Sequence, residues 1–276
     1  MLTRIDRVQL AVPDRQVVAK AWSSLLGAEH DGEDRVACLG ASRTRLRLGS
    51  GFVELLEPDG TGPVADAVER RGGHLFAAGF ATDDINELVA RLQANGADPD
   101  VEGGQAFLDA GHGLRVVVSI DEELPAVGAI DELYEVTNLV ADAEVAAASY
   151  AERFGLHPSH FEPISSNQYG YAGTLTLFHP DRLHRVEVIH PHASEKTMGR
   201  YFARHGESLY MCFAESGDIS AITDRASEAG LGVTPVADHT VFVHPQGLGG
   251  TMLGLSRRTY AWTWSGHPER VEAVQQ

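Results

Sequence analysis

Two short runs of similar composition constrain this chain more than any other feature. Residues 52–58, FVELLEP, and residues 185–191, RVEVIHP, each place one glutamate inside an apolar stretch that ends at proline. A short run rich in Val and Leu or Ile and bounded by proline is typical of a buried strand. Burying a carboxylate there costs several kcal/mol unless a cation, a proton or hydrogen bonds compensate for the lost water. Because Glu54 and Glu187 carry this cost in both halves of the chain, we expect the halves to share one design.

The order of predicted elements repeats along the chain. Apolar periodicity, together with Gly, Pro, Asn and Asp at the breaks, predicts a strand, a helix and then further strands four times over. The predicted strands cover residues 5–12, 36–39, 44–48, 52–56, 75–81, 105–109, 114–120, 130–136, 173–178, 185–189, 209–214, 241–244 and 251–255, and the principal predicted helices 15–26, 85–94, 142–154 and 219–229. Glu54 and Glu187, like Asp84 and Asp218, recur at an offset of about 133 residues, which indicates an internal duplication.

The length of 276 residues favours two domains. Residues 121–129, DEELPAVGA, are charged, contain Pro and Gly and lack periodicity, so they predict a linker between residues 1–120 and residues 130–256. The tail, residues 257–276, is polar apart from Tyr260, Trp262 and Trp264. These aromatic residues alternate as on one face of a strand, and we expect them to cover an apolar sheet edge, with a substrate lid or a dimer contact as the alternative.

Composition excludes some classes of partner. The formal net charge of −17 argues against a nucleic-acid or anionic-membrane surface, because both need clustered Lys and Arg. Cys38 and Cys212 lie far apart without a CxxC pair, which predicts buried thiols instead of a disulfide or a structural zinc site. The first residues show no apolar signal core, and no apolar run approaches 18 residues, so we expect a cytoplasmic location.

Four segments in sequence order carry a resemblance to a known family. Together with the four strand–helix units, the segments IDRVQLAVPD, FVELLEPDGTGPVADAVERRGG, TDDINELVARLQANG and FVHPQGLGGTMLGL resemble the vicinal oxygen chelate superfamily. Its members include glyoxalase I, methylmalonyl-CoA epimerase, bleomycin-resistance proteins and extradiol ring-cleaving dioxygenases. The resemblance implies an α+β fold in which four βαβββ modules form two cup-shaped glyoxalase-like domains. It also implies a divalent metal in a cup, acting as a Lewis acid on an enolate or, as iron, activating dioxygen.

In the first half, the resemblance leaves one ligand. The ligand positions of the family fall on Arg7, Glu54, Ala77 and, near the last one, Val117. Only Glu54 can bind a metal. We expect the Arg7 guanidinium to replace the cation and to pair with Glu54, which would make this cup a degenerate site.

In the second half, the same positions fall on Glu132, Glu187, Tyr210 or Met211, and Gly254. The absence of a two-His-one-carboxylate set argues against extradiol oxygenation. Strand alternation from Glu132 places Tyr134 on the same face. His244 and His190, each followed by proline at the end of a strand, remain candidate rim ligands or proton shuttles.

We therefore expect an enzyme that acts on a small oxygenated organic molecule in the second cup, as an isomerase or lyase before a dioxygenase. Glu187 and Glu132 would be acid–base residues or, with His244, ligands of a divalent metal, and Tyr134 or Tyr210 would orient the substrate oxygen. The identity of a metal, or whether none is needed, stays open, and the resemblance adds a homodimer as an expectation. The alternative is a metal-free binding protein of the bleomycin-resistance type. An aromatic cup with Glu187 neutralised by arginine would favour binding, and contact between Glu132 and Glu187 beside a cavity would favour catalysis.

Overall fold

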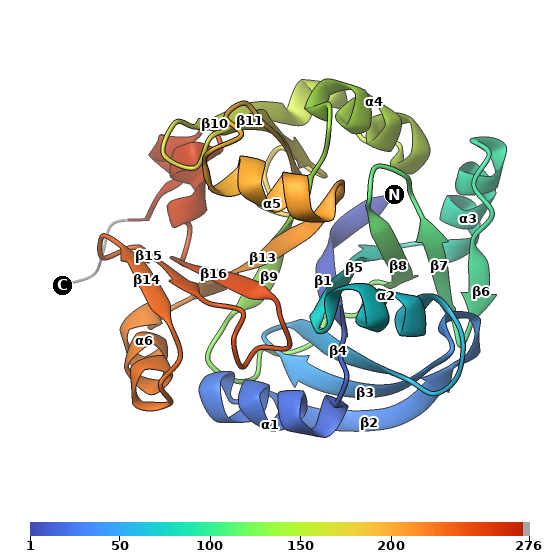
Figure 1. Ribbon diagram of the computed structural model, residues 1–276. Helices are drawn as coiled ribbons and strands as arrows, with labels where there is room; N and C mark the ends of the chain where they lie inside the picture. The colour runs from blue at the N-terminus through green and yellow to red at the C-terminus, as the bar shows by residue number, and fades with distance from the viewer. Residues whose placement is uncertain (273–276) are drawn as a thin grey trace.

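The computed structural model describes residues 1–272 and contains two eight-stranded sheets, one from each half of the chain (Figure 1). The first sheet has the order β2-β3-β4-β1-β5-β8-β7-β6, with β1 (Leu2–Ala11), β2 (Glu29–Val36), β3 (Ala41–Leu48), β4 (Gly51–Pro58), β5 (His74–Thr82), β6 (Asp100–Glu102), β7 (Gln105–Asp109) and β8 (Arg115–Ile120). The second has the order β10-β11-β12-β9-β13-β16-β15-β14, with β9 (Glu132–Leu139), β10 (Phe161–Ser166), β11 (Tyr171–Leu177), β12 (Arg185–Pro191), β13 (Ser208–Ser216), β14 (Val233–Val236), β15 (Thr240–Val243) and β16 (Met252–Arg257). The helices are α1 (Arg15–Leu26), α2 (Pro63–Arg71), α3 (Ile85–Ala94), α4 (Ala143–Phe154), α5 (Thr197–His205) and α6 (Ile219–Glu228).

The two sheets have the same topology. In the first sheet β1 pairs in parallel with β4 and antiparallel with β5, and in the second β9 pairs in parallel with β12 and antiparallel with β13. Each sheet therefore joins two βαβββ units along its central strand pair. The predicted α+β architecture of four such units in two curled sheets is confirmed. We call the concave faces the N-terminal cup and the C-terminal cup.

The same local chemistry starts the helix of each unit. Asp14, Asp84, Asp142 and Asp218 are the N-cap residues of α1, α3, α4 and α6, and each side chain accepts hydrogen bonds from backbone N–H groups of the first turn. Such a cap satisfies donors that have no partner within the helix. The sequence of a strand, an N-cap aspartate and a helix thus occurs four times. The strands and helices of the four units therefore lie in equivalent positions.

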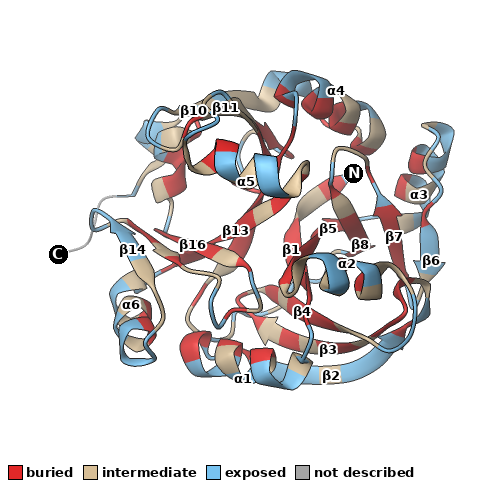
Figure 2. Ribbon diagram, viewed as in Figure 1, coloured by how far each residue is buried: buried red, intermediate tan, exposed pale blue. Residues whose placement is uncertain are grey.

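The convex faces of the two sheets form one hydrophobic core. Val8 and Val53 from the first half and Val188 from the second are fully buried in this shared cluster. The Phe80 ring of β5 packs edge-to-face against Phe154 of α4, with ring centroids 5.3 Å apart. Helix α1 contacts α6, α3 contacts α4, and β1 contacts β9. Figure 2 shows the result as buried central strands flanked by half-buried helices. The two cups keep separate apolar clusters on their concave faces.

Several predicted elements differ from the structure. The strand expected at residues 36–39 is wrong, because Ala37–Leu39 forms a 3-10 turn after the edge strand β2. The alternation of Tyr260, Trp262 and Trp264 does not reflect a strand, because Tyr260–Trp264 is a 3-10 helix in which Trp262 is buried. The last residues of the predicted tail, 273–276, lie outside the described part of the chain.

The segment predicted as a linker, residues 121–129, runs from β8 to β9 and packs on the first half. Within it, Val127 pairs with Gly49, and the Ala129 N–H donates to Leu26 O. Of the helices in residues 1–272, none combines the length and the apolar character that a bilayer-spanning segment needs.

Candidate functional site

The N-terminal cup contains a closed network of charges around Glu54. This fully buried carboxylate accepts hydrogen bonds from Arg7 Nη1 at 2.7 Å, from Gln9 Nε2 at 2.7 Å and from Arg43 Nη1 at 3.2 Å. Burial favours the protonated form, but the Arg7 and Arg43 charges outweigh it and hold the pKa of Glu54 below its usual value. The expected ion pair between Arg7 and Glu54 is therefore present, and the interior of this cup is occupied by protein side chains.

Glycine on the neighbouring strand makes room for the Arg7 side chain. A Cβ atom at Gly79 of β5 would lie 1.9 Å from Arg7 Cγ, so a larger residue there would displace the guanidinium. Arg7 also pairs with Asp6 at 2.6 Å, and Asp6 accepts a hydrogen bond from Ser119. Whether the N-terminal cup has lost a catalytic function stays a prediction.

Strand register identifies the matching positions in the C-terminal cup. Gln9 lies opposite Glu54, and Thr137 lies opposite Glu187. Two residues earlier on each central strand are Arg7 and Glu135. The second cup therefore carries a carboxylate where the first carries a guanidinium. This corrects the expected alignment, which placed Glu132 at that position.

Smaller side chains in the second half leave a cavity. The position of Arg43 in the first sheet is taken by Gly173 in the second, and that of Gln105 by Thr240. The resulting cavity has a volume of about 440 Å³. Its aromatic lining comprises Tyr169, Tyr171, Tyr210, Phe213, Phe242, Tyr260 and Trp264. The cavity opens to solvent between these rings, and it suits a small molecule with an apolar or aromatic body.

Two buried carboxyl groups with different partners line this cavity. Arg185 Nε lies 2.6 Å from Glu135 Oε2, and both side chains are at most 2 % exposed. Glu187 instead accepts a hydrogen bond from Thr137 Oγ1 at 2.6 Å. Burial and, after it, the negative charge of Glu135 raise the pKa of Glu187 to about 8. Burial also raises the pKa of Glu135, and Arg185 opposes that rise. The guanidinium partner of Glu135 favours the ionised form of that group, and Glu187, which has no such partner, is the carboxyl group of the pair on which burial favours a proton.

The structure brings only part of the predicted site together. Glu187, Tyr210 and His244 line the cavity, whereas Glu132 and Tyr134 do not. Glu132 lies at the start of β9 opposite Glu215, and its carboxylate is 3.4 Å from His184 Nε2.

Tyr134 is fully buried, and its hydroxyl lies 3.1 Å from Ser256 Oγ. His244 is held at the rim, with Nε2 2.8 Å from Thr234 Oγ1. His190 is outside the cavity lining. The contact between Glu132 and Glu187 that would have favoured catalysis is therefore absent among residues 1–272, and the acidic residue next to Glu187 on β9 is Glu135.

The donor set of the C-terminal cup does not fit a resident divalent metal. Across residues 1–272, no three His, Cys, Asp or Glu side chains are arranged to hold an ion. Of the two alternatives expected for the third ligand position, Tyr210 and Met211, strand register selects Met211 as the match of Ala77, and Gly254 matches Val117. Neither Met211 nor Gly254 has a side-chain oxygen or nitrogen. Arg185 already neutralises Glu135 and would repel a neighbouring cation.

Glu135 and Thr137 are the residues that sequence reasoning missed. A direct comparison of the segments RVQLAVPD and EVTNLVAD, residues 7–14 and 135–142, would have found them. Both segments end at the N-cap aspartate of the following helix, Asp14 or Asp142. Counting back from these two caps aligns Arg7 with Glu135 without a gap.

Comparisons with known proteins agree on the fold. Residues 6–115 match the family model described as the Glyoxalase/Bleomycin resistance protein/Dioxygenase superfamily. No curated protein matches the chain in sequence.

Among solved structures, a variant of 4-hydroxymandelate synthase from Streptomyces coelicolor is similar over 94 % of this chain and 93 % of its own, with a TM-score of 0.73 and 15 % identity. A halotolerant catechol dioxygenase is similar over 93 % of this chain and 87 % of its own, with a TM-score of 0.62 and 14 % identity. A fusion protein of a xylose isomerase-like TIM barrel and 4-hydroxyphenylpyruvate dioxygenase is similar over 94 % of this chain and 49 % of its own, with a TM-score of 0.64 and 13 % identity. At these identities the likeness concerns the fold of the whole chain.

Proposed function

We propose that the C-terminal cup binds a small oxygenated organic molecule and transfers a proton at a carbon next to a carbonyl group; in support, residues 6–115 match the glyoxalase/bleomycin resistance protein/dioxygenase superfamily model and the whole chain shares the fold of the solved structures above. The reaction class is that of an isomerase or a lyase acting through an enolate. The proposal applies to the C-terminal cup because the interior of the N-terminal cup is occupied by the Arg7, Glu54 and Arg43 network.

One observation carries this proposal, namely that Arg185 pairs with Glu135 and leaves Glu187, which lines the cavity, with a hydroxyl partner and no guanidinium partner. A general acid or base works best when its pKa lies near the operating pH, and the pKa of Glu187 is raised to about 8. Glu135, held as a carboxylate by Arg185, keeps the pKa of its neighbour high without giving up its own charge. Glu187 would accept the carbon-bound proton in its ionised form and return it to the same or to a neighbouring carbon.

Tyr210 would stabilise the oxyanion that forms in this step. Within residues 1–272 its hydroxyl donates only to a weak sulfur acceptor, Met252 Sδ at 3.7 Å, so it can turn to a substrate oxygen at little cost. Burial raises the pKa of Tyr210 to about 12, which keeps the hydroxyl protonated and able to donate a hydrogen bond. Tyr134, the other expected donor, is separated from the cavity and has no such role in this proposal.

The donor set favours this side-chain chemistry over oxygen activation at iron. A ring-cleaving dioxygenase needs a metal with vicinal positions for substrate and dioxygen, and Met211 and Gly254 supply no ligands for one. A protonated carboxylic acid beside an ionised one needs no metal to move a proton.

Ligand sequestration without chemistry is the second candidate. The aromatic lining of the cavity favours it, because seven aromatic side chains give a planar ligand a large apolar contact area. The position of Arg185 speaks against it, because the guanidinium neutralises Glu135 and leaves Glu187 as a titratable group facing the ligand.

The experiment follows exchange of carbon-bound hydrogen in D₂O by NMR, using a panel of aryl-substituted 1,3-diketones and 2-oxo acids. We expect the wild type to exchange at least one of these compounds and Glu187→Gln to be slower by about 10²-fold or more. Glutamine keeps the shape of the side chain, so the variant should still bind the compound. The matched control is Glu152→Gln, which removes one carboxylate from the exposed face of α4.

Equal exchange by wild type and Glu187→Gln would contradict the catalytic assignment. Binding without exchange in either protein would support sequestration instead. Elemental mass spectrometry of the same preparations tests the donor-set argument, because a stoichiometric divalent metal that is lost in Glu187→Ala would show that the cup holds a metal after all.

A further inference from the structure

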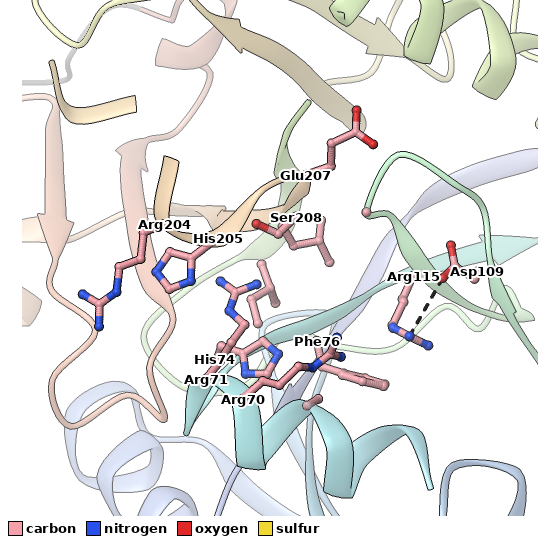
Figure 3. Close-up of a pocket in the computed structure, with 14 residues that line it drawn as sticks. Arg70, Arg71, His74, Phe76, Asp109, Arg115, Arg204, His205, Glu207 and Ser208 are labelled. Atoms are coloured by element: carbon pink, nitrogen blue, oxygen red, sulfur yellow. Dashed lines mark ion pairs between the residues drawn. The ribbon is translucent and has the colours of Figure 1, made fainter. Parts of the chain in front are cut away.

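A second cavity, about 550 Å³ in volume, lies between the two halves of the chain. Its walls come from the end of α2 and the start of β5 in the first half, and from the end of α5 and the start of β13 in the second. Four arginines and two histidines line it: Arg70, Arg71, Arg115, Arg204, His74 and His205. Figure 3 shows Arg70, Arg71 and His74 on one wall and His205 on the facing wall. We call this cavity the basic cleft.

The concentration of positive charge is unusual for this chain. The protein has a formal net charge of −17 and only 22 Lys and Arg residues in all. Chance would give a cleft on such a surface an acidic lining. Like charges gathered in one cleft without a counter-ion repel each other, and a bound anion would relieve that repulsion.

The internal duplication builds the basic cleft from the same segment twice. The sequence RRGGHL at residues 70–75 corresponds to RHGESL at residues 204–209. In both copies a helix ends at a glycine with nearly the same conformation, Gly72 at φ 67°, ψ −150° and Gly206 at φ 66°, ψ −158°. Each copy places two basic residues in the last helical turn, and the packing of the two halves brings both copies to one cleft.

The helix dipole explains the basic residues only in part. Arg and His at a helix C-terminus stabilise it by a few tenths of a kcal/mol to about 1 kcal/mol each. That effect does not require the two helix ends to face one another. It also gives no reason for Arg115, which lies on β8 with its guanidinium 5.1 Å from the centre of the Phe76 ring.

Carboxylates of the protein do not neutralise the cleft. Within residues 1–272, Arg70, Arg71 and Arg204 form no ion pair, and Arg115 has one at 3.9 Å with Asp109. Glu207, the other acidic residue of the lining, accepts a hydrogen bond from the Ala141 N–H and lies 3.5 Å from His112. The Glu207 carboxylate points away from the arginines in Figure 3.

Arg71 has donors left over at this wall. Its guanidinium donates one side-chain hydrogen bond within residues 1–272, to the Tyr201 hydroxyl. A guanidinium has five N–H donors, so Arg71 can also donate to a ligand in the cleft. Burial first, and then the nearby Arg71 charge, lower the pKa of His74 to about 4 and also lower the pKa of His205. The cleft is thus strongly positive even with both imidazoles neutral.

We propose that the basic cleft is a binding site for a small organic molecule that carries phosphate groups. Guanidinium groups match phosphate oxygens in paired, charge-assisted hydrogen bonds, and arginine is the only cationic side chain that lines this cleft. The volume exceeds that of a phosphate ion, and Phe76 and Leu209 supply an apolar wall for the organic part. The site is separate from the C-terminal cup, so the proposal does not depend on the chemistry assigned there.

Isothermal titration calorimetry tests the site with pyrophosphate as the probe, and with inorganic phosphate and citrate for comparison, at a constant ionic strength of about 0.15 M. We expect saturable binding of pyrophosphate that is weakened about tenfold or more in Arg70→Gln/Arg204→Gln. Both arginines are exposed, so this variant should fold normally. The control is Lys20→Gln/Arg182→Gln, which removes two exposed positive charges outside the cleft and should bind as the wild type does.

Equal weakening in both double variants would overturn the proposal, since it would reduce the effect to net charge. Binding of citrate without binding of pyrophosphate would overturn the assignment to phosphate. A second variant, Arg71→Gln, removes the Arg71 guanidinium from the wall of the cleft. If both this variant and Arg70→Gln/Arg204→Gln bind pyrophosphate with the affinity of the wild type, the anion binds outside the basic cleft and the proposal is wrong.

Discussion

Glu135 and Glu187 lie on neighbouring parallel strands, and only Glu135 has a guanidinium partner. The guanidinium favours the charged form of Glu135, whereas burial and the Glu135 charge raise the pKa of Glu187 to about 8. In the N-terminal cup, by contrast, two guanidinium groups and an amide converge on the single carboxylate of Glu54. The same fold thus surrounds a carboxylate with cations in one cup and leaves one carboxyl group without a guanidinium partner in the other.

The substitution Glu187→Gln should change the pH dependence of stability. The ordinary glutamate pKa of 4.5 applies to the unfolded chain, and burial raises it to about 8 in the folded protein. The contribution of Glu187 to the free energy of unfolding is therefore fully present below pH 4.5 and is lost as the pH rises through about 8. Glutamine cannot ionise, so the variant should exceed the wild type by on the order of 3 kcal/mol at about pH 9 and match it near pH 4. Urea unfolding at the two pH values measures the difference, and a difference independent of pH would contradict the assignment.

Removing Arg7 should destabilise the protein strongly. Arg7→Met takes the closest positive charge away from the fully buried Glu54, and breaking a buried pair in this way costs about 3–5 kcal/mol. Because the remaining charge causes most of that loss, Arg7→Met/Glu54→Gln should be more stable than Arg7→Met alone. Chemical unfolding of the four proteins in the cycle gives the coupling energy. Simple addition of the two single effects would show that the pair is not coupled.

Substitutions on β9 should show that Glu135, and not Glu132, influences the pKa of Glu187. Glu135→Gln removes the negative charge beside Glu187 and frees Arg185, so the pKa of Glu187 should fall. Glu132→Gln should leave it unchanged, because Glu132 contacts His184 outside the cavity. NMR titration of ¹³C-labelled glutamate side chains reports both outcomes. If the pKa of Glu187 falls more in Glu132→Gln than in Glu135→Gln, then Glu132, and not Glu135, is the carboxylate that acts on Glu187.

The tryptophans that follow β16 should differ in their contribution to stability. Trp262 is buried in the cluster that covers Tyr134, so Trp262→Ala should lower the free energy of unfolding by about 3–5 kcal/mol. Trp264 is half-buried and lines the cavity, so Trp264→Ala should cost less stability but weaken binding of any aromatic ligand. Thermal unfolding and titration with the compound found by hydrogen exchange measure the two effects. Equal losses of stability would contradict this division.

Much of the fold could be predicted from local chemistry. Strand β12 and helix α3 start where the sequence predicts, because proline, aspartate and glycine act within a few residues of themselves. The outer strands were missed for a physical reason. Strand β2, EHDGEDRV, lies at a sheet edge and is largely exposed, so its hydrogen bonds to β3 need no apolar face. Figure 2 shows the same exposure along β2 and β6. Edge strands of this kind leave no periodic pattern to detect.

The candidate site was predicted less completely. Glu187 and Tyr210 lie in the cavity as the sequence indicates, but alternation counted from Glu132 fails within β9. The register between β9 and β13 shifts between Leu133 and Glu135, so strict alternation does not hold across Tyr134. Such an irregularity depends on pairing with a distant strand. The cavity is lined by Thr240 where the first sheet has Gln105, and this difference appears only when both sheets are compared position by position.

The helix contacts across the shared core relate the chain to a symmetric dimer. Helix α1 meets α6 and α3 meets α4, so each first helix of one half packs on the second helix of the other. This reciprocal pattern is that of an isologous interface between two identical subunits. Here residues 121–129 connect the two, and association has become intramolecular, with the effective concentration that a short linker provides. In a homodimer, every substitution is present in both subunits. A tethered pair has no such constraint, so one cup can hold arginines in its interior while the other holds a cavity.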